Sequence, residues 1–166
     1  FVSVTCGAGG TAAGPTLESC QKLDEQGYDS VMPHCTCVSR SRDEVLDSID
    51  TMVDQGFNNI MALRGDPPKG EQYFKPAPDG FHYATEMVAA LRQRQPDVCI
   101  GVAGYPEKHP EAYNGVEDIL HLKEKVDAGA DFITTQLFLH NHVYFEFVEK
   151  CRDAGITVPI LPGLLP

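Results

Sequence analysis

Apolar and polar positions alternate along this chain in a repeating pattern of short buried segments and longer amphipathic ones. The apolar runs predict strands at residues 1–5, 29–35, 58–63, 98–104, 131–138 and 157–162. Apolar residues at helical spacing predict helices at roughly 15–26, 42–55, 80–94, 115–128 and 140–154. A strand–helix repeat of about 25 to 40 residues is typical of βα units that build a parallel sheet.

Glycines and long loops support this prediction and indicate where the functional face lies. A glycine that suits a left-handed C-cap follows four of the predicted helices, at Gly27, Gly56, Gly129 and Gly155. Two connections, residues 66–79 and 105–114, are rich in Pro or Gly and longer than a usual βα loop. Both follow strands, so we expect them to lie on one functional face of the sheet.

Composition narrows the class of partner and the compartment. The formal net charge is −11 without a basic cluster, which argues against nucleic acid or an anionic membrane as a partner and favours a small molecule. No apolar run approaches the ~20 residues of a membrane span, and no signal peptide opens the chain. The six cysteines lack C-x-x-C pairs, so we interpret them as reduced and the protein as cytoplasmic. Phe1 and Pro166 adjoin apolar runs, so residues 1–166 are predicted to be one domain truncated at both ends.

The most informative stretch is the third predicted strand, which ends in Arg64, Gly65 and Asp66. In parallel α/β proteins ligands bind at the carboxyl ends of strands, so charges at this place point to function. The two side chains flank a glycine and can reach one ligand. The alternative is a structural ion pair between Arg64 and Asp66.

The first two strand ends carry weaker signals. The loop from Cys6 to Gly10 could cradle a phosphate with its backbone amides or be a plain turn, and it lacks the spacing of a dinucleotide fingerprint. His34 ends the second predicted strand beside Cys35 and Cys37, which suggests zinc superficially. Neighbouring strand residues point to opposite faces, so we predict no metal site.

Polar side chains also follow the fourth and fifth strands. A proline-stiffened loop presents Tyr105 and His109, and Gln136 offers an amide that suits the edge of a heterocycle, although a surface amide is the alternative. In the next-to-last helix three polar residues share one face, namely Asp118, His121 and Lys125. That face is either a ligand-binding face or a solvated one.

Taken together, these segments resemble the catalytic domain of the methylenetetrahydrofolate reductase family, a flavin-dependent (β/α)8 TIM-type barrel. The resemblance rests on six segments in family order, at residues 4–5, 33–37, 62–66, 103–112, 122–130 and 135–138. It implies an incomplete barrel here, with about six of the eight strands. It also implies that FAD takes hydride from NADH or NADPH and passes it to 5,10-methylenetetrahydrofolate, giving 5-methyltetrahydrofolate for one-carbon metabolism and methionine supply.

The resemblance implies roles for individual residues. Asp66 corresponds to a carboxylate near the flavin and the folate, and Gln136 would hydrogen-bond the folate pterin; both are the predicted catalytic and substrate-binding residues. The implied FAD site contains Asp66 together with Thr5, Cys6, His34, Arg64, Gly65, Tyr83, Ala84, Tyr105, His109, Asp118, His121 and Lys125. The full-length protein would be a homo-oligomer.

The resemblance also leads to an expectation about the isolated chain. Family members carry the proposed general acid on a strand that precedes the equivalent of Phe1, so we expect the isolated 166 residues to be inactive and poorly stable.

Two alternative functions stay open. Another TIM-barrel enzyme with a phosphorylated substrate would also explain charged strand ends, but a Schiff-base aldolase is disfavoured because none of four lysines ends a strand, namely Lys69, Lys75, Lys108 and Lys123. The other alternative is a non-catalytic FAD-binding fragment or paralogue.

Overall fold

The computed structural model describes residues 1–6, 13–67, 70–71 and 73–163. Its strands are β1 (Val2–Val4), β2 (Val31–Thr36), β3 (Asn59–Leu63), β4 (Cys99–Gly104), β5 (Phe132–Thr135) and β6 (Ile160–Leu161). Its helices are α1 (Ala13–Glu25), α2 (Arg42–Asp54), α3 (Ala84–Arg94), α4 (Gly115–Asp127) and α5 (Asn141–Asp153). Strands and helices alternate throughout, as the hydrophobic pattern predicts.

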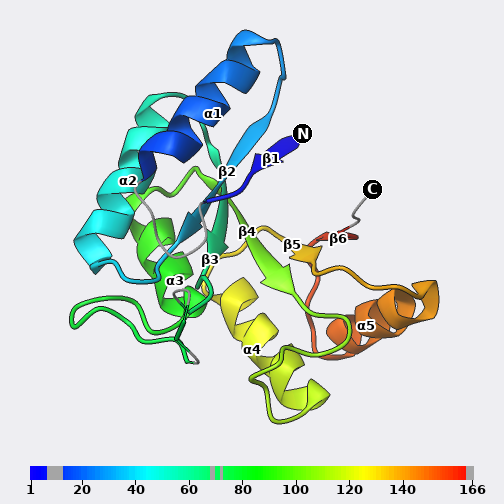
Figure 1. Cartoon of the computed structure of the whole chain (residues 1–166). Coiled ribbons are helices and arrows are strands. Elements are labelled where there is room, and N and C mark those ends of the chain that lie inside the picture. Colours follow the sequence, from blue (N-terminus) through cyan, green and yellow to red (C-terminus); the bar gives the residue numbers. More distant parts are fainter. Residues whose placement is uncertain (7–12, 68–69, 72, 164–166) are drawn as a thin grey trace.

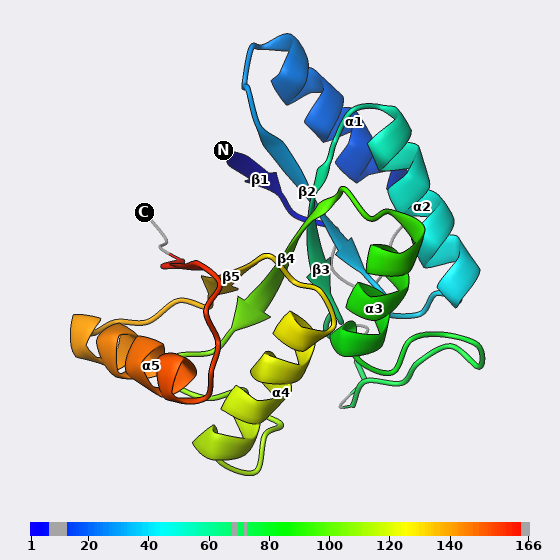
Figure 2. The same cartoon turned by 180° about the vertical axis from the view of Figure 1, so that it is seen from behind.

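The six strands form one parallel sheet in the order β1-β2-β3-β4-β5-β6. Figures 1 and 2 show the helices ranged around the outside of this curved sheet. Within the described residues β1 and β6 are the two edges of the sheet, so the strands form an open half-barrel. The architecture is that of an incomplete (β/α)8 barrel, which confirms the predicted fold class.

Helix ends agree with the glycine pattern. Gly27, Gly56, Gly129 and Gly155 have positive φ angles of 85°, 92°, 121° and 80°. This is the left-handed region in which a Cβ is unfavourable, so each glycine ends its helix and turns the chain towards the next strand.

Some element boundaries differ from the prediction. Helix α3 begins at Ala84 rather than at residue 80, because the preceding segment is tied elsewhere: the Asp79 carbonyl accepts a hydrogen bond from the Arg42 backbone N–H, at 3.2 Å. The Phe81 ring is fully buried there, with the Arg42 guanidinium 4.7 Å from its centroid. Strand β5 ends at Thr135 rather than at residue 138, and β6 is only two residues long.

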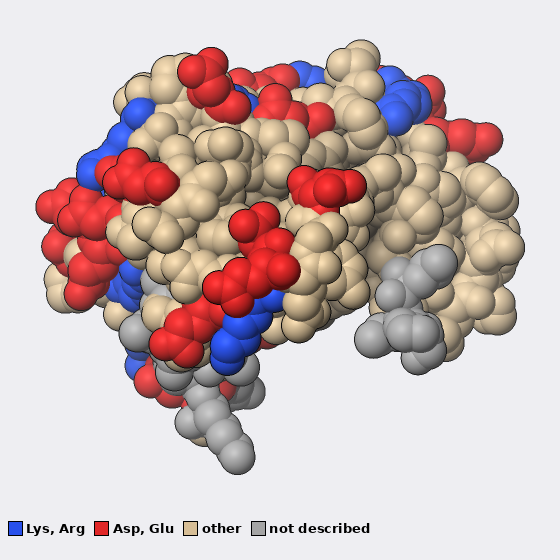
Figure 3. All heavy atoms as spheres, turned by 90° about the horizontal axis from the view of Figure 1, so that it is seen from above, with Lys and Arg blue, Asp and Glu red and all other residues tan. Residues whose placement is uncertain are grey.

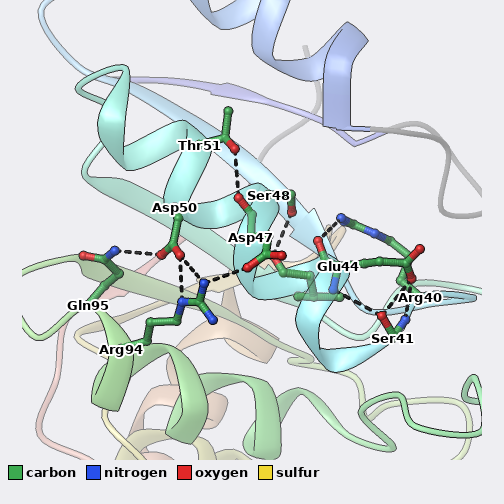
Figure 4. A network of polar contacts seen from close by, with 10 residues as sticks. Arg40, Ser41, Glu44, Asp47, Ser48, Asp50, Thr51, Arg94 and Gln95 are labelled. Atoms are coloured by element: carbon green, nitrogen blue, oxygen red, sulfur yellow. Dashed lines mark hydrogen bonds and ion pairs between the residues drawn. The ribbon is translucent and has the colours of Figure 1, made fainter.

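Two networks of contacts hold the outer helices. Ser41 and Glu44 form a reciprocal capping box at the start of α2, which satisfies backbone N–H groups that the helix leaves open. Arg94 of α3 donates hydrogen bonds of 2.7 Å to both Asp47 and Asp50 of α2 (Figure 4). These polar contacts run along the outer surface and leave the carboxyl ends of the strands free for the site.

The surface carries the excess of acidic residues expected from the net charge of −11. Figure 3 shows acidic side chains spread over the face seen from above, with basic side chains beside some of them. None of the helices that the structure describes has the length and apolar character needed to cross a bilayer.

The two faces of the sheet are packed differently. Residues such as Ile60, Val102 and Ile133 face the helices and form the main core with the helices' apolar sides. On the other face, Gly101 lies against the Phe132 ring and the Met61 sulfur. A Cβ at Gly101 would lie 2.9 Å from the Met61 sulfur and closer still to the ring, so the glycine makes room for the two large side chains.

We predict that Gly101→Ala destabilises the fold by about 1 to 3 kcal/mol, because the extra methyl overpacks this layer. Chemical denaturation of the purified protein measures the effect. Gly115→Ala is the matched control, since a Cβ at Gly115 would meet no atom within 4 Å. Equal stability of the Gly101→Ala variant and wild type would contradict the packing described here.

Candidate functional site

A cavity of about 1070 Å³ lies at the carboxyl ends of the strands. Its wall is built by the ends of β1 to β5, by the β4–α4 loop, by the start of α3 and by one side of α4. Every residue that the sequence analysis assigned to the FAD and folate sites lines this one cavity. The fold therefore brings together side chains that are spread between positions 5 and 136 of the chain.

His34 and its neighbouring cysteine separate as strand geometry predicts. His34 does not end β2 as expected but lies two residues before its end, in the cavity wall, where burial lowers the imidazole pKa. Cys35 points to the other face, is 1% exposed, and has a thiol pKa that burial raises to about 11. In the part of the chain that the structure describes, no three His, Cys, Asp or Glu side chains gather to hold a metal ion, and no disulfide joins the cysteines.

Arg64 is paired across the cavity mouth with Glu111 and not with Asp66. Its Nη1 and Nη2 atoms donate to the two carboxylate oxygens of Glu111, each at 2.7 Å. The Phe74 ring lies against the same guanidinium, 4.7 Å from Cζ to the ring centroid. The alternative of an Arg64–Asp66 ion pair is thus wrong, and Glu111 is a cavity residue that sequence reasoning missed.

Asp66 remains open to a ligand. Its side chain is exposed at the cavity, and within the described residues it makes no hydrogen bond or ion pair. The preceding Gly65 has a φ of 89°, and a Cβ there would lie 2.8 Å from the Val38 side chain. The glycine is required for this turn, and the turn places Asp66 at the rim.

Lys125 reaches from α4 to the end of β4. Its Nζ donates to the Ala103 carbonyl at 2.8 Å. Burial lowers the ammonium pKa to about 8, while the nearby Asp118 carboxylate acts in the opposite direction. The sequence analysis assigned Lys125 to the FAD site but did not weigh it as a candidate Schiff-base lysine, although its amine reaches a strand end.

The rest of the predicted α4 face divides between cavity and solvent. Asp118 accepts a hydrogen bond from the backbone N–H of His109, at 2.9 Å, so it ties the β4–α4 loop to the helix. His121 is 58% exposed and lies 3.2 Å from Glu124. The ligand-binding interpretation of this helix face therefore fits Asp118 and Lys125. Most of the His121 side chain is in contact with solvent, as the alternative interpretation predicts.

Two rings of the β4–α4 loop pack edge to face. The centroids of Tyr105 and His109 are 4.6 Å apart at an interplanar angle of 81°. Burial lowers the pKa of His109, while burial and the Asp66 carboxylate raise the pKa of Tyr105. Both rings therefore stay neutral near pH 7 and serve as hydrogen-bonding and stacking groups.

Thr134 of β5 and Gln136, which directly follows that strand, supply neutral polar groups. The Gln136 backbone N–H donates to the Gly104 carbonyl at 2.7 Å, and its side-chain oxygen accepts from the Leu137 N–H at 3.1 Å. The side-chain NH2 group is then left for a ligand. Thr134 also lines the cavity, and its buried hydroxyl has no hydrogen-bond partner in the described structure.

Other predicted positions frame the cavity. Thr5 and Cys6 follow β1, and Tyr83 and Ala84 are the N-cap and first residue of α3. The proposed phosphate cradle between Cys6 and Gly10 falls mostly on residues 7–10, which lie outside the described residues.

A parallel β/α half-barrel with polar side chains gathered at the carboxyl ends of its strands defines the TIM-barrel class of ligand-binding proteins. Within that class, a family model described as methylenetetrahydrofolate reductase matches residues 1–166. The chain belongs to the methylenetetrahydrofolate reductase family.

Individual relatives agree with the family model. The chain is 40% identical over 176 residues to a probable methylenetetrahydrofolate reductase (NADH) of Oryza sativa subsp. japonica, matching all of this chain and 30% of the rice protein. It is 40% identical over 166 residues to the 5,10-methylenetetrahydrofolate reductase of Salmonella typhimurium, covering 54% of that protein. The chain thus spans about a third to a half of the length of these relatives.

Solved structures support the fold alone. A 2,3-dimethylmalate lyase superposes with a TM-score of 0.61 at 10% identity, covering 92% of this chain and 60% of the lyase. An oxaloacetate acetylhydrolase superposes with a TM-score of 0.62 at 10% identity, covering 98% of this chain and 68% of that structure. Sequence identity this low carries no functional inference.

Proposed function

We propose that this chain forms most of the FAD site of an enzyme that transfers hydride from NADH or NADPH to 5,10-methylenetetrahydrofolate. The observation that carries the proposal is the single cavity in which cationic, acidic and amide groups converge at the carboxyl ends of five strands. Membership of the family supports this hydride-transfer chemistry, and the names of the rice and maize relatives specify NADH. The cytoplasmic location and the homo-oligomeric state stay predictions.

The residues present fit FAD. A cavity of about 1070 Å³ lies just above the range of roughly 300 to 1,000 Å³ that is usual for small-molecule and cofactor sites, so it has room for a dinucleotide. Lys125 and Arg64 provide positive charge suited to a diphosphate, and His109 adds a neutral ring donor. The Thr134 hydroxyl, which has no hydrogen-bond partner among the described residues, offers one further polar contact.

Asp66 and Gln136 are the proposed substrate-facing residues. When bound, FAD would accept hydride from the nicotinamide and deliver it to the folate. The Asp66 carboxylate would orient the folate and bias the electrostatics near the flavin. The Gln136 NH2 group would donate a hydrogen bond to an acceptor on the pterin ring.

An absorbance titration tests the proposal. We expect FAD added to the full-length protein to bind saturably, with its band at about 450 nm perturbed by the protein and bleached by NADH or NADPH under anaerobic conditions. A folded protein that leaves the FAD spectrum unchanged would exclude the proposed function. If the protein retains FAD but neither NADH nor NADPH bleaches it, the result would favour the non-catalytic flavin-binding alternative.

A further inference from the structure

Glu111 makes more contacts with the cavity's donors than any other acidic residue described at its rim. Its carboxylate accepts both hydrogen bonds of the Arg64 fork, each at 2.7 Å. Its backbone N–H donates to Nδ1 of His109, at 3.1 Å. One residue of the β4–α4 loop therefore contacts two groups that the proposed function assigns to the FAD site.

The pairing immobilises the Arg64 guanidinium. A bidentate carboxylate holds one edge of its plane, and the Phe74 ring lies against it with Cζ 4.7 Å from the centroid. The Arg64 side chain is only 19% exposed, so few other rotamers are accessible. Glu111 uses two of the five N–H donors of an arginine, and three remain for a ligand.

The hydrogen bond from the Glu111 backbone N–H fixes the tautomer of the His109 ring. A ring nitrogen that accepts an N–H bond carries no proton, so Nδ1 is the acceptor and Nε2 carries the hydrogen of the neutral ring. The backbone N–H of His109 is itself bound to Asp118 of α4, at 2.9 Å, which secures the loop on its other side. His109 is thus presented as an Nε2–H donor.

We propose that Glu111 is a positioning residue that holds Arg64 and His109 ready as donors for an anionic ligand of the cavity. The proposal rests on the proposed function in taking that ligand to be FAD. Pre-organised donors bind more tightly because the side-chain freedom is lost before the ligand arrives. A simple charge argument predicts the opposite effect, since a carboxylate at the mouth repels an anion.

The sign of the Glu111→Gln effect separates these two views. We expect Glu111→Gln to weaken binding of FAD, and of inorganic pyrophosphate as a flavin-independent probe, by about three- to tenfold. Glu111→Asp, which keeps the charge, should recover part of the loss. Glu107→Gln is the matched control, because Glu107 is an exposed acid of the same loop that does not line the cavity. Unchanged or tighter binding in Glu111→Gln would overturn the proposal.

A double-variant comparison distinguishes positioning from a general role in loop structure. In an Arg64→Gln background the Glu111→Gln change should no longer weaken binding, because the group that it positions is gone. The same loss in both backgrounds would show that Glu111 only maintains the loop, and would overturn the proposal.

Nuclear magnetic resonance of the ligand-free protein gives a readout that needs no flavin. In wild type and in Glu107→Gln we expect separate signals for the Arg64 Nη protons, and in Glu111→Gln we expect these signals to merge. We also expect the His109 ring to carry its proton on Nε2. Freely rotating Arg64 in wild type, or His109 protonated on Nδ1, would contradict the proposal. If Arg64 is fixed and the protein binds pyrophosphate but not FAD, the proposed function is refuted while the role of Glu111 is supported. If the protein binds neither probe, both are refuted.

Discussion

Replacing Lys125 with methionine is expected to weaken FAD binding by about 10- to 100-fold, the loss typical of one charge-assisted hydrogen bond. Lys125 lines the cavity, and the other charges that act on its ammonium group are Asp118 and Arg64. Fluorescence quenching of FAD titrated with protein measures the affinity. Lys123→Met is the control, since Lys123 lies on the same helix but pairs with Asp127 and does not line the cavity.

The same lysine predicts a pH dependence with a definite sign. Because burial lowers its pKa to about 8, Lys125 is cationic below that pH and loses its charge as the pH rises through it. Affinity for anionic FAD should therefore fall from about pH 7 to pH 9. The complex favours the charged form, so FAD binding near pH 8 should take up protons. A pH-independent affinity in wild type, or an unchanged profile in Lys125→Met, would contradict this assignment.

In the full-length protein, Asp66→Asn is expected to lower reductase turnover by at least about 100-fold while FAD stays bound, the scale of loss seen when one group that stabilises developing charge is removed. The substitution is nearly isosteric and removes only the charge of a side chain that has no partner in the described structure. Anaerobic reoxidation of the reduced flavin by 5,10-methylenetetrahydrofolate, followed at about 450 nm, isolates the folate half-reaction.

Glu71→Gln is the matched control for Asp66. Glu71 lies in the same connection between β3 and α3, does not line the cavity, and is 4.0 Å from Lys75. It should leave both half-reactions unchanged. Full folate turnover in Asp66→Asn would remove Asp66 from the proposed catalytic residues, and loss of FAD from that variant would reassign it to cofactor binding.

Much of the architecture follows from local sequence. The apolar period distinguishes strands from helices, and glycines such as Gly27 and Gly129 end helices because the left-handed conformation favours them wherever the rest of the chain goes. Parallel βα repeats place all strand carboxyl ends at one edge. For that reason Arg64, Asp66 and Gln136 could be assigned to one site before any contact was known.

The pairing of side chains depends on the tertiary structure. From sequence Asp66, two residues away, is the obvious partner of Arg64, yet the guanidinium binds Glu111, which is 47 residues further along. Lys125 likewise reaches the carbonyl of Ala103, 22 positions earlier. Which acid or carbonyl meets a given cation depends on how the loops and helices pack against the ends of the strands.

By itself, the sequence determined the alternation of elements, the helix ends marked by glycine and most of the residues near the strand ends, because these depend on local periodicity and on the direction of parallel strands. Only the tertiary structure decided that α3 starts at Ala84, that Gly101 makes room for Phe132, and that Glu111 fixes Arg64. These features come from contacts between segments far apart in the chain, whose geometry is set by close packing rather than by the local pattern.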